Sequence, residues 1–166
     1  MIKFIELFAG IGGFRNGLEQ TGGYECIYAN EFDKYSNSIY KRHYKECDIR
    51  NIRSVRADEI PKCDMVVGGF PCQPFSIAGS RKGLDDKRGD LFFEVIRIIK
   101  DKRPSIVLLE NVKGLLNIQK GKVFTSILRA FQEFDYNVQA EILNTKNFGI
   151  PQNRERIFII ATFGKA

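Results

Sequence analysis

The sequence predicts one α/β domain built around an open sheet, and three observations lead to this prediction. Short apolar runs alternate with amphipathic stretches along the chain, which is typical of strands and helices that follow one another. The 166 residues suffice for one core but leave little room for a second domain of similar size. We see no repeat, low-complexity segment or linker. In such a fold, ligands bind beyond the carboxyl ends of the strands.

Each element follows from its hydrophobic pattern. We expect strands over Lys3–Phe8, Tyr24–Asn30, Met65–Gly69, Ile106–Glu110 and Arg156–Thr162. We expect helices over Phe14–Gln20, Asp33–His43, Leu91–Lys100 and Val123–Phe134. The polar stretch 73–89 has no clear helix or strand pattern, and long loops of this kind are usually functional.

Composition and charge exclude several classes of protein. With 43% hydrophobic and 28% charged residues, the chain is neither disordered, nor collagen-like, nor a disulfide scaffold. The net charge is +6, and segments 79–103 and 144–166 each carry a net +3. These segments are able to approach a polyanion, although a solvated helix face and a basic tail explain the charge better when it is taken alone.

The cysteines and the first residues of the chain bear on metal binding and location. The four cysteines, Cys26, Cys47, Cys63 and Cys72, form no C-x-x-C pair, so we do not expect a structural zinc site. The sequence shows neither a secretory leader nor an apolar run long enough to cross a membrane. We therefore expect a reducing, cytoplasmic location in a prokaryotic cell and no membrane partner.

A glycine-rich turn follows the first predicted strand. The segment F-A-G-I-G-G spans residues 8–13, and its glycines allow a ligand to approach the backbone at the start of a helix. It is not the dinucleotide fingerprint, because Arg15 stands where the third glycine would be. Glu31 ends the second strand, where an acid commonly binds both ribose hydroxyls, and we expect Asp48 after a third strand. Together these residues indicate a nucleoside-containing cofactor without a pyrophosphate, although a tight connection explains the glycine turn alone equally well.

A second motif, G-F-P-C-Q-P-F-S, places a cysteine directly after a strand. Prolines on both sides restrict the backbone around Cys72, which points from the carboxyl edge of the sheet toward the cofactor. Such a thiol is a candidate nucleophile, and a basic or helix-terminal environment would increase its thiolate fraction. We expect the other three cysteines to be small buried hydrophobic residues.

Two further motifs carry charges at strand ends. The segment E-N-V, residues 110–112, ends an apolar run, so the Glu110 carboxyl group either pairs with an arginine or stays partly protonated as a general acid. The segment Q-N-R-E-R precedes the last strand, and alternation would place Arg154 and Arg156 on one side. A charged strand entry explains this last segment as well as function does.

The four motifs in this order resemble the cytosine carbon-5 DNA methyltransferase family, and the resemblance covers the whole chain. Amino-group methyltransferases carry a Pro-Pro-aromatic motif that is absent here. The resemblance implies a Rossmann-like S-adenosylmethionine-dependent methyltransferase sheet with helices on both faces. It also implies methyl transfer from S-adenosylmethionine to carbon 5 of cytosine in duplex DNA, with base flipping, in a restriction-modification system.

The resemblance assigns roles to individual residues. Phe8 would lie against the adenine, Glu31 on the ribose and Asp48 near the adenine amino group. The implied cofactor-binding set is Phe8, Gly10, Ile11, Gly12, Glu31, Phe32, Asp48, Ile49, Pro71 and Leu91. The implied catalytic set is Cys72, Glu110, Arg154 and Arg156. Residues 79–89 fit the family's mobile catalytic loop, whose cations would contact DNA phosphates.

The chain departs from the family's pattern in one respect. Family members usually continue into a target-recognition region and a final helix, and this sequence contains neither. We therefore weigh a complementary C-terminal subunit, a shortened gene and a degenerate relative, and the intact motifs favour the first two. A tRNA cytosine-5 methyltransferase and a non-catalytic regulatory or split-enzyme subunit are the alternatives to an active DNA enzyme.

Overall fold

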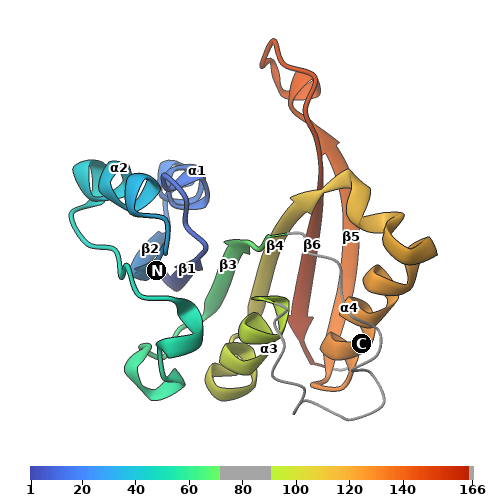
Figure 1. The fold of residues 1–166 in the computed structure, drawn as a ribbon, viewed down its shortest axis with the longest axis horizontal. Helices are drawn as coiled ribbons and strands as arrows, with labels where there is room; N and C mark the ends of the chain where they lie inside the picture. The colour runs from blue at the N-terminus through green and yellow to red at the C-terminus, as the bar shows by residue number, and fades with distance from the viewer. Residues whose placement is uncertain (72–90, 165–166) are drawn as a thin grey trace.

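The computed structural model describes residues 1–71 and 91–164 (Figure 1). Its strands are β1 (Ile2–Leu7), β2 (Tyr24–Asn30), β3 (Met65–Gly69), β4 (Ile106–Val112), β5 (Tyr136–Asn144) and β6 (Glu155–Phe163). Its α-helices are α1 (Gly13–Thr21), α2 (Lys34–Tyr44), α3 (Leu91–Lys102) and α4 (Lys122–Gln132). Short 3₁₀ segments include Ile52–Ser54, Lys113–Leu116 and Thr145–Phe148.

The strands form one mixed sheet in the order β2-β1-β3-β4-β6-β5. The first four strands in this order are parallel, whereas β6 runs antiparallel to both β4 and β5. The sequence patterns do not predict β5. This edge strand, Y-N-V-Q-A-E-I-L-N, exposes five of its nine residues, so its polar positions obscure the apolar signal of a buried strand.

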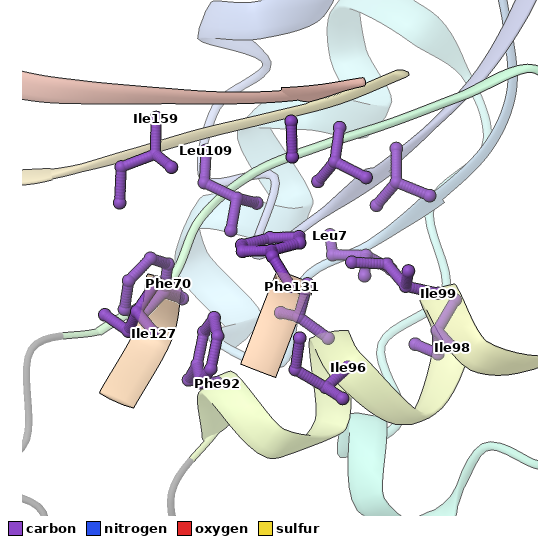
Figure 2. Packing of buried hydrophobic residues seen from close by; sticks show 14 of the residues in the cluster. Leu7, Phe70, Phe92, Ile96, Ile98, Ile99, Leu109, Ile127, Phe131 and Ile159 are labelled. Atoms are coloured by element: carbon purple, nitrogen blue, oxygen red, sulfur yellow. The ribbon is translucent and has the colours of Figure 1, made fainter. Parts of the chain in front are cut away.

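Helices cover both faces of the sheet, as expected from the resemblance. On one face, Ile5 and Leu7 of β1 belong to a large apolar cluster with residues of α3 and α4. Figure 2 shows Phe92 and Ile96 of α3 in this cluster, below the strands. On the other face, Phe4 belongs to a smaller cluster against which Phe14 and Leu18 of α1 pack. The alternation of side chains along β1 therefore divides the core into two layers.

One close approach between strands requires a glycine. Gly68 of β3 lies opposite Leu7 of β1, and a Cβ atom built on Gly68 would lie 2.5 Å from the Leu7 carbonyl oxygen. Any larger side chain would push the two central strands apart.

The position of Asp48 differs from the expectation. It follows no third strand, but forms one isolated parallel bridge with Asn30 and precedes β3 in the chain. The bridge nevertheless places Asp48 beside the end of β2, which Glu31 directly follows. Among the described residues, no helix is long and apolar enough to span a bilayer.

Candidate active site

The glycine-rich turn leaves β1 through three residues in the left-handed region of backbone space. Phe8, Gly10 and Gly12 have φ values of 53°, 55° and 95°. Gly12 is also held closely from one side, because a Cβ atom there would collide with the ring of Tyr44. The turn therefore depends on glycine for both conformation and space.

Glu31 ties this turn to the end of β2. One carboxylate oxygen accepts a hydrogen bond from the Gly10 amide at 2.8 Å, and the other accepts one from the Asp33 amide at 2.7 Å. Asp33 in turn caps α2 by accepting a hydrogen bond from the Ser36 amide. The orientation of Glu31 is thus fixed at the carboxyl edge of the sheet, and each oxygen retains capacity to accept a ligand hydroxyl.

Asp48 lies next to Glu31 through backbone hydrogen bonds. The Glu31 amide donates to the Asp48 carbonyl at 2.9 Å. The Asp48 carboxylate accepts hydrogen bonds from the Tyr28 hydroxyl at 3.0 Å and the Arg50 guanidinium at 2.8 Å. Burial opposes ionisation of Asp48, but these hydrogen bonds outweigh it and lower the pKa of the carboxyl group. Asp48 is therefore an ionised acceptor beside Glu31.

Exposed apolar residues adjoin these two acids and the glycine-rich turn in the sequence. Ile11, Phe32 and Ile49 are 60%, 65% and 46% exposed, and they come from the turn, the segment after β2 and the segment after Asp48. Pro71 and Leu91 are partly buried near the ends of β3 and α3. Apolar residues beside two fixed carboxylates suit a nucleoside, so the segments around Glu31 and Asp48 fit the cofactor that the sequence predicts, and the roles of Pro71 and Leu91 stay predictions.

A second cluster lies where β4 meets β6. The Arg156 guanidinium pairs with the Glu110 carboxylate at an Nε–Oε1 distance of 2.8 Å, and both side chains are about three-quarters buried. The structure thus selects pairing with an arginine from the two alternatives for Glu110. Gly69 leaves room for this pair, since a Cβ atom there would lie 3.1 Å from Glu110 Oε2.

Arg154 does not share this arrangement. It precedes β6, is exposed, and contributes its backbone carbonyl to a hydrogen bond with the Thr145 amide. Of the two expected arginines, Arg156 pairs with Glu110, and the catalytic role of Arg154 stays a prediction. Cys72 and the predicted loop 79–89 lie outside the described residues.

Comparison with known proteins identifies the chain's family. The family model for the C-5 cytosine-specific DNA methylase matches residues 2–165. The chain belongs to this family. Over about 160 residues it is 44% identical to the type II methyltransferase M.HhaI of Haemophilus parahaemolyticus and 48% identical to M1.ScrFI of Lactococcus lactis subsp. cremoris. The matches cover 96% and 95% of this chain but 48% and 41% of those proteins, so the chain spans about half their length.

Solved structures support the same family. The Dnmt2 methyltransferase of S. pombe has a TM-score of 0.81 at 25% identity, over 98% of this chain and 51% of that one. The Spodoptera frugiperda DNMT2 mutant gives 0.80 at 28% identity, over 98% and 50%. The expected Rossmann-like methyltransferase fold is thus confirmed, and S-adenosylmethionine is the methyl donor of C-5 cytosine methylases.

The sequence patterns assigned no role to Asn111, the buried middle residue of the E-N-V motif. Asn111, only 3% exposed, donates a hydrogen bond from Nδ2 to the Phe70 carbonyl at 2.9 Å. Its Oδ1 accepts one from the Val112 amide at 2.8 Å. Asn111 thereby connects the end of β4 to the backbone that leads into Pro71 and Cys72. A signal was present in the sequence, because an amide side chain near the end of an apolar strand needs partners when it is buried.

Proposed function

We propose that this chain carries the catalytic machinery of a DNA (cytosine-5-)-methyltransferase and binds S-adenosylmethionine at the glycine-rich turn. The observation that carries the proposal is the ion pair of Glu110 and Arg156, which lies one strand away from the segment leading to Cys72. The Glu110 carboxylate offers hydrogen-bond acceptors and the Arg156 guanidinium offers donors for the polar edge of a pyrimidine.

The proposed reaction begins with a covalent step. Carbon 5 of cytosine is a poor nucleophile, so the Cys72 thiolate adds to carbon 6 and the electrons of the 5,6 double bond become available at carbon 5. Bound S-adenosylmethionine supplies an electrophilic methyl group to that carbon. Loss of the carbon-5 proton and elimination of the Cys72 thiolate then restore the aromatic ring and the free enzyme.

The ion pair positions the base during this sequence. Glu110 accepts a hydrogen bond from the exocyclic amine and interacts with ring nitrogen 3, and Arg156 donates to the base oxygen. Arg156 also keeps Glu110 oriented, since its Nε lies 2.8 Å from the carboxylate. This pre-organisation lowers the cost of holding a flipped base.

A trapping experiment tests the covalent step. Duplex DNA containing 5-fluorocytosine cannot lose the carbon-5 substituent as a proton, so wild-type protein with S-adenosylmethionine should form a stable adduct visible on a denaturing gel. Cys72→Ser should form none, while Cys63→Ala, which alters a buried cysteine of the core, should retain the adduct. An adduct formed by Cys72→Ser would refute the mechanism.

The partners are part of the same proposal. Duplex DNA is the substrate, with tRNA as the alternative, and labelled methyl transfer to each separates them. The relatives are about twice as long as this chain, which supports a complementary segment or subunit that selects the target sequence. Low transfer by the chain alone, restored by such a segment, is the expected result. We further propose a cytoplasmic restriction-modification role, in keeping with the type II methyltransferases among its relatives.

A further inference from the structure

A buried polar cluster lies behind the glycine-rich turn, and the proposed reaction does not use it. Its centre is Glu6 of β1, which is 1% exposed, and Tyr40 of α2, which is fully buried. The Tyr40 hydroxyl donates a hydrogen bond to Glu6 Oε2 at 3.0 Å. A carboxyl group so far from water requires partners, and Tyr40 reaches it from an element 34 residues away in the chain.

Glu6 also holds the helix that follows the turn. Helix α1 has no side-chain cap at Gly12, so its first amides need acceptors from elsewhere. Glu6 Oε1 accepts a hydrogen bond from the Arg15 amide at 3.3 Å, and the Phe14 amide also donates to this carboxyl group. A carboxylate facing the first turn of a helix also interacts favourably with the helix dipole. Glu6 therefore fixes the start of α1 from the strand below.

Tyr40 acts on the same turn from the side. A Cβ atom on Gly12 would lie 3.2 Å from a ring carbon of Tyr40, so the ring lies directly against the turn. Its hydroxyl lies 3.5 Å from the Arg15 guanidinium, which donates to it. One tyrosine thus contacts the turn, the acid below it and a side chain of α1.

Burial raises the pKa of Glu6 to about 7, although the Tyr40 hydroxyl and the α1 amides favour the ionised form. Other titratable groups surround this acid. They are Arg15 and Glu19 on α1, Tyr40 and Tyr44 on α2, Cys26 on β2 and Cys47 after α2. Most of these groups keep their protons at neutral pH, because burial, hydrogen bonds or nearby charges raise their pKa values. They are the Cys26 and Cys47 thiols, the two tyrosines and the Arg15 guanidinium.

We propose that Glu6 and Tyr40 are positioning residues for the glycine-rich turn, and that the turn binds S-adenosylmethionine more tightly when Glu6 carries its charge. An ionised carboxylate accepts stronger hydrogen bonds from the α1 amides than a protonated one does. It also attracts a cofactor that carries a sulfonium cation. This inference rests on the proposed cofactor site, and adds a pH-dependent control of its affinity.

Calorimetric titration of the purified chain with S-adenosylmethionine between pH 5.5 and 8.5 tests the inference. Dividing each variant's affinity by the wild-type affinity at the same pH cancels the effect of the ligand's own ionisation on binding. Glu6→Gln should bind about fivefold more weakly than wild type at pH 8.5 and equally at pH 5.5. Tyr40→Phe, the milder change, should move the midpoint of the affinity profile about one pH unit upward, since it loses a hydrogen bond to the ionised form.

Tyr44→Phe is the matched control. It is the same substitution on the same helix, and its ring also contacts Gly12, but its hydroxyl makes no hydrogen bond to Glu6. It should keep the wild-type profile. The inference would be overturned if wild type binds S-adenosylmethionine but the ratio of the Glu6→Gln affinity to the wild-type affinity does not change with pH. That result would still support the cofactor site. No binding by wild type at any pH would overturn both.

Discussion

Replacing Asn111 with alanine should destabilise the protein by about 3 kcal/mol. The substitution removes two hydrogen bonds, of 2.9 Å to the Phe70 carbonyl and 2.8 Å from the Val112 amide. It leaves the Phe70 carbonyl without its buried partner, and each buried polar group that loses its partner costs about 1–3 kcal/mol. The Val112 amide is nearer the surface, so its loss should lie at the low end of that range.

Urea unfolding followed by circular dichroism at 222 nm measures this cost, since the chain contains no tryptophan. Asn16→Ala provides the control, because Asn16 is exposed on α1 and accepts only a surface hydrogen bond from Gln20. Its free energy of unfolding should change by less than about 0.5 kcal/mol. A loss below about 1 kcal/mol in Asn111→Ala would refute the view that this amide anchors the segment before Cys72.

Three further predictions concern stability. The pKa of Glu6, raised from 4.5 to about 7, means that the folded state binds a proton more tightly than the unfolded state, so stability falls as pH rises across this window. Between about pH 5 and pH 8, the free energy of unfolding should fall by about 3 kcal/mol less in Glu6→Gln than in wild type, as measured by urea unfolding. An equal fall in both proteins would contradict this prediction. Gly68→Ala should destabilise by about 2–3 kcal/mol because its Cβ meets the Leu7 carbonyl oxygen, whereas Gly17→Ala on the open surface of α1 should be neutral or stabilising. Phe131→Ala should cost about 3–5 kcal/mol in thermal or urea unfolding, since this ring is fully buried, and a smaller loss would mean that the core closes around the cavity.

The sequence predicts the part of the fold that local patterns encode. The expected strand over Tyr24–Asn30 and the one over Met65–Gly69 match β2 and β3 residue for residue, because both are apolar runs that end at polar or glycine residues. Strand β5 is different, since it is stabilised by pairing with β6 along nine residues rather than by an apolar pattern of its own. Non-local pairing of this kind leaves no periodic signal in a single sequence.

The candidate site shows the same division. Glu31 was identified from its place at the end of the second expected strand and Glu110 because it ends an apolar run, and the structure places both at the carboxyl edge of the parallel strands. The partnership of Glu6 with Tyr40 could not be predicted, because it joins residues 34 positions apart through the packing of α2 on β1. Asp48 was expected after a third strand, but it forms only a single bridge to Asn30. Such a bridge leaves no hydrophobic pattern in the sequence.

The reversed direction of β6 has a consequence for how this architecture accommodates change. Because β6 starts where the parallel strands end, the β5–β6 turn projects past the body of the domain on the same side as the ion pair of Arg156 (Figure 1). Residues 145–154 form this projection, and none of them belongs to the apolar core. Insertions or substitutions there would change the surface beside Arg156 and should have little effect on the free energy of unfolding. Sequence variation in this hairpin turn is therefore largely independent of the core packing that stabilises the fold.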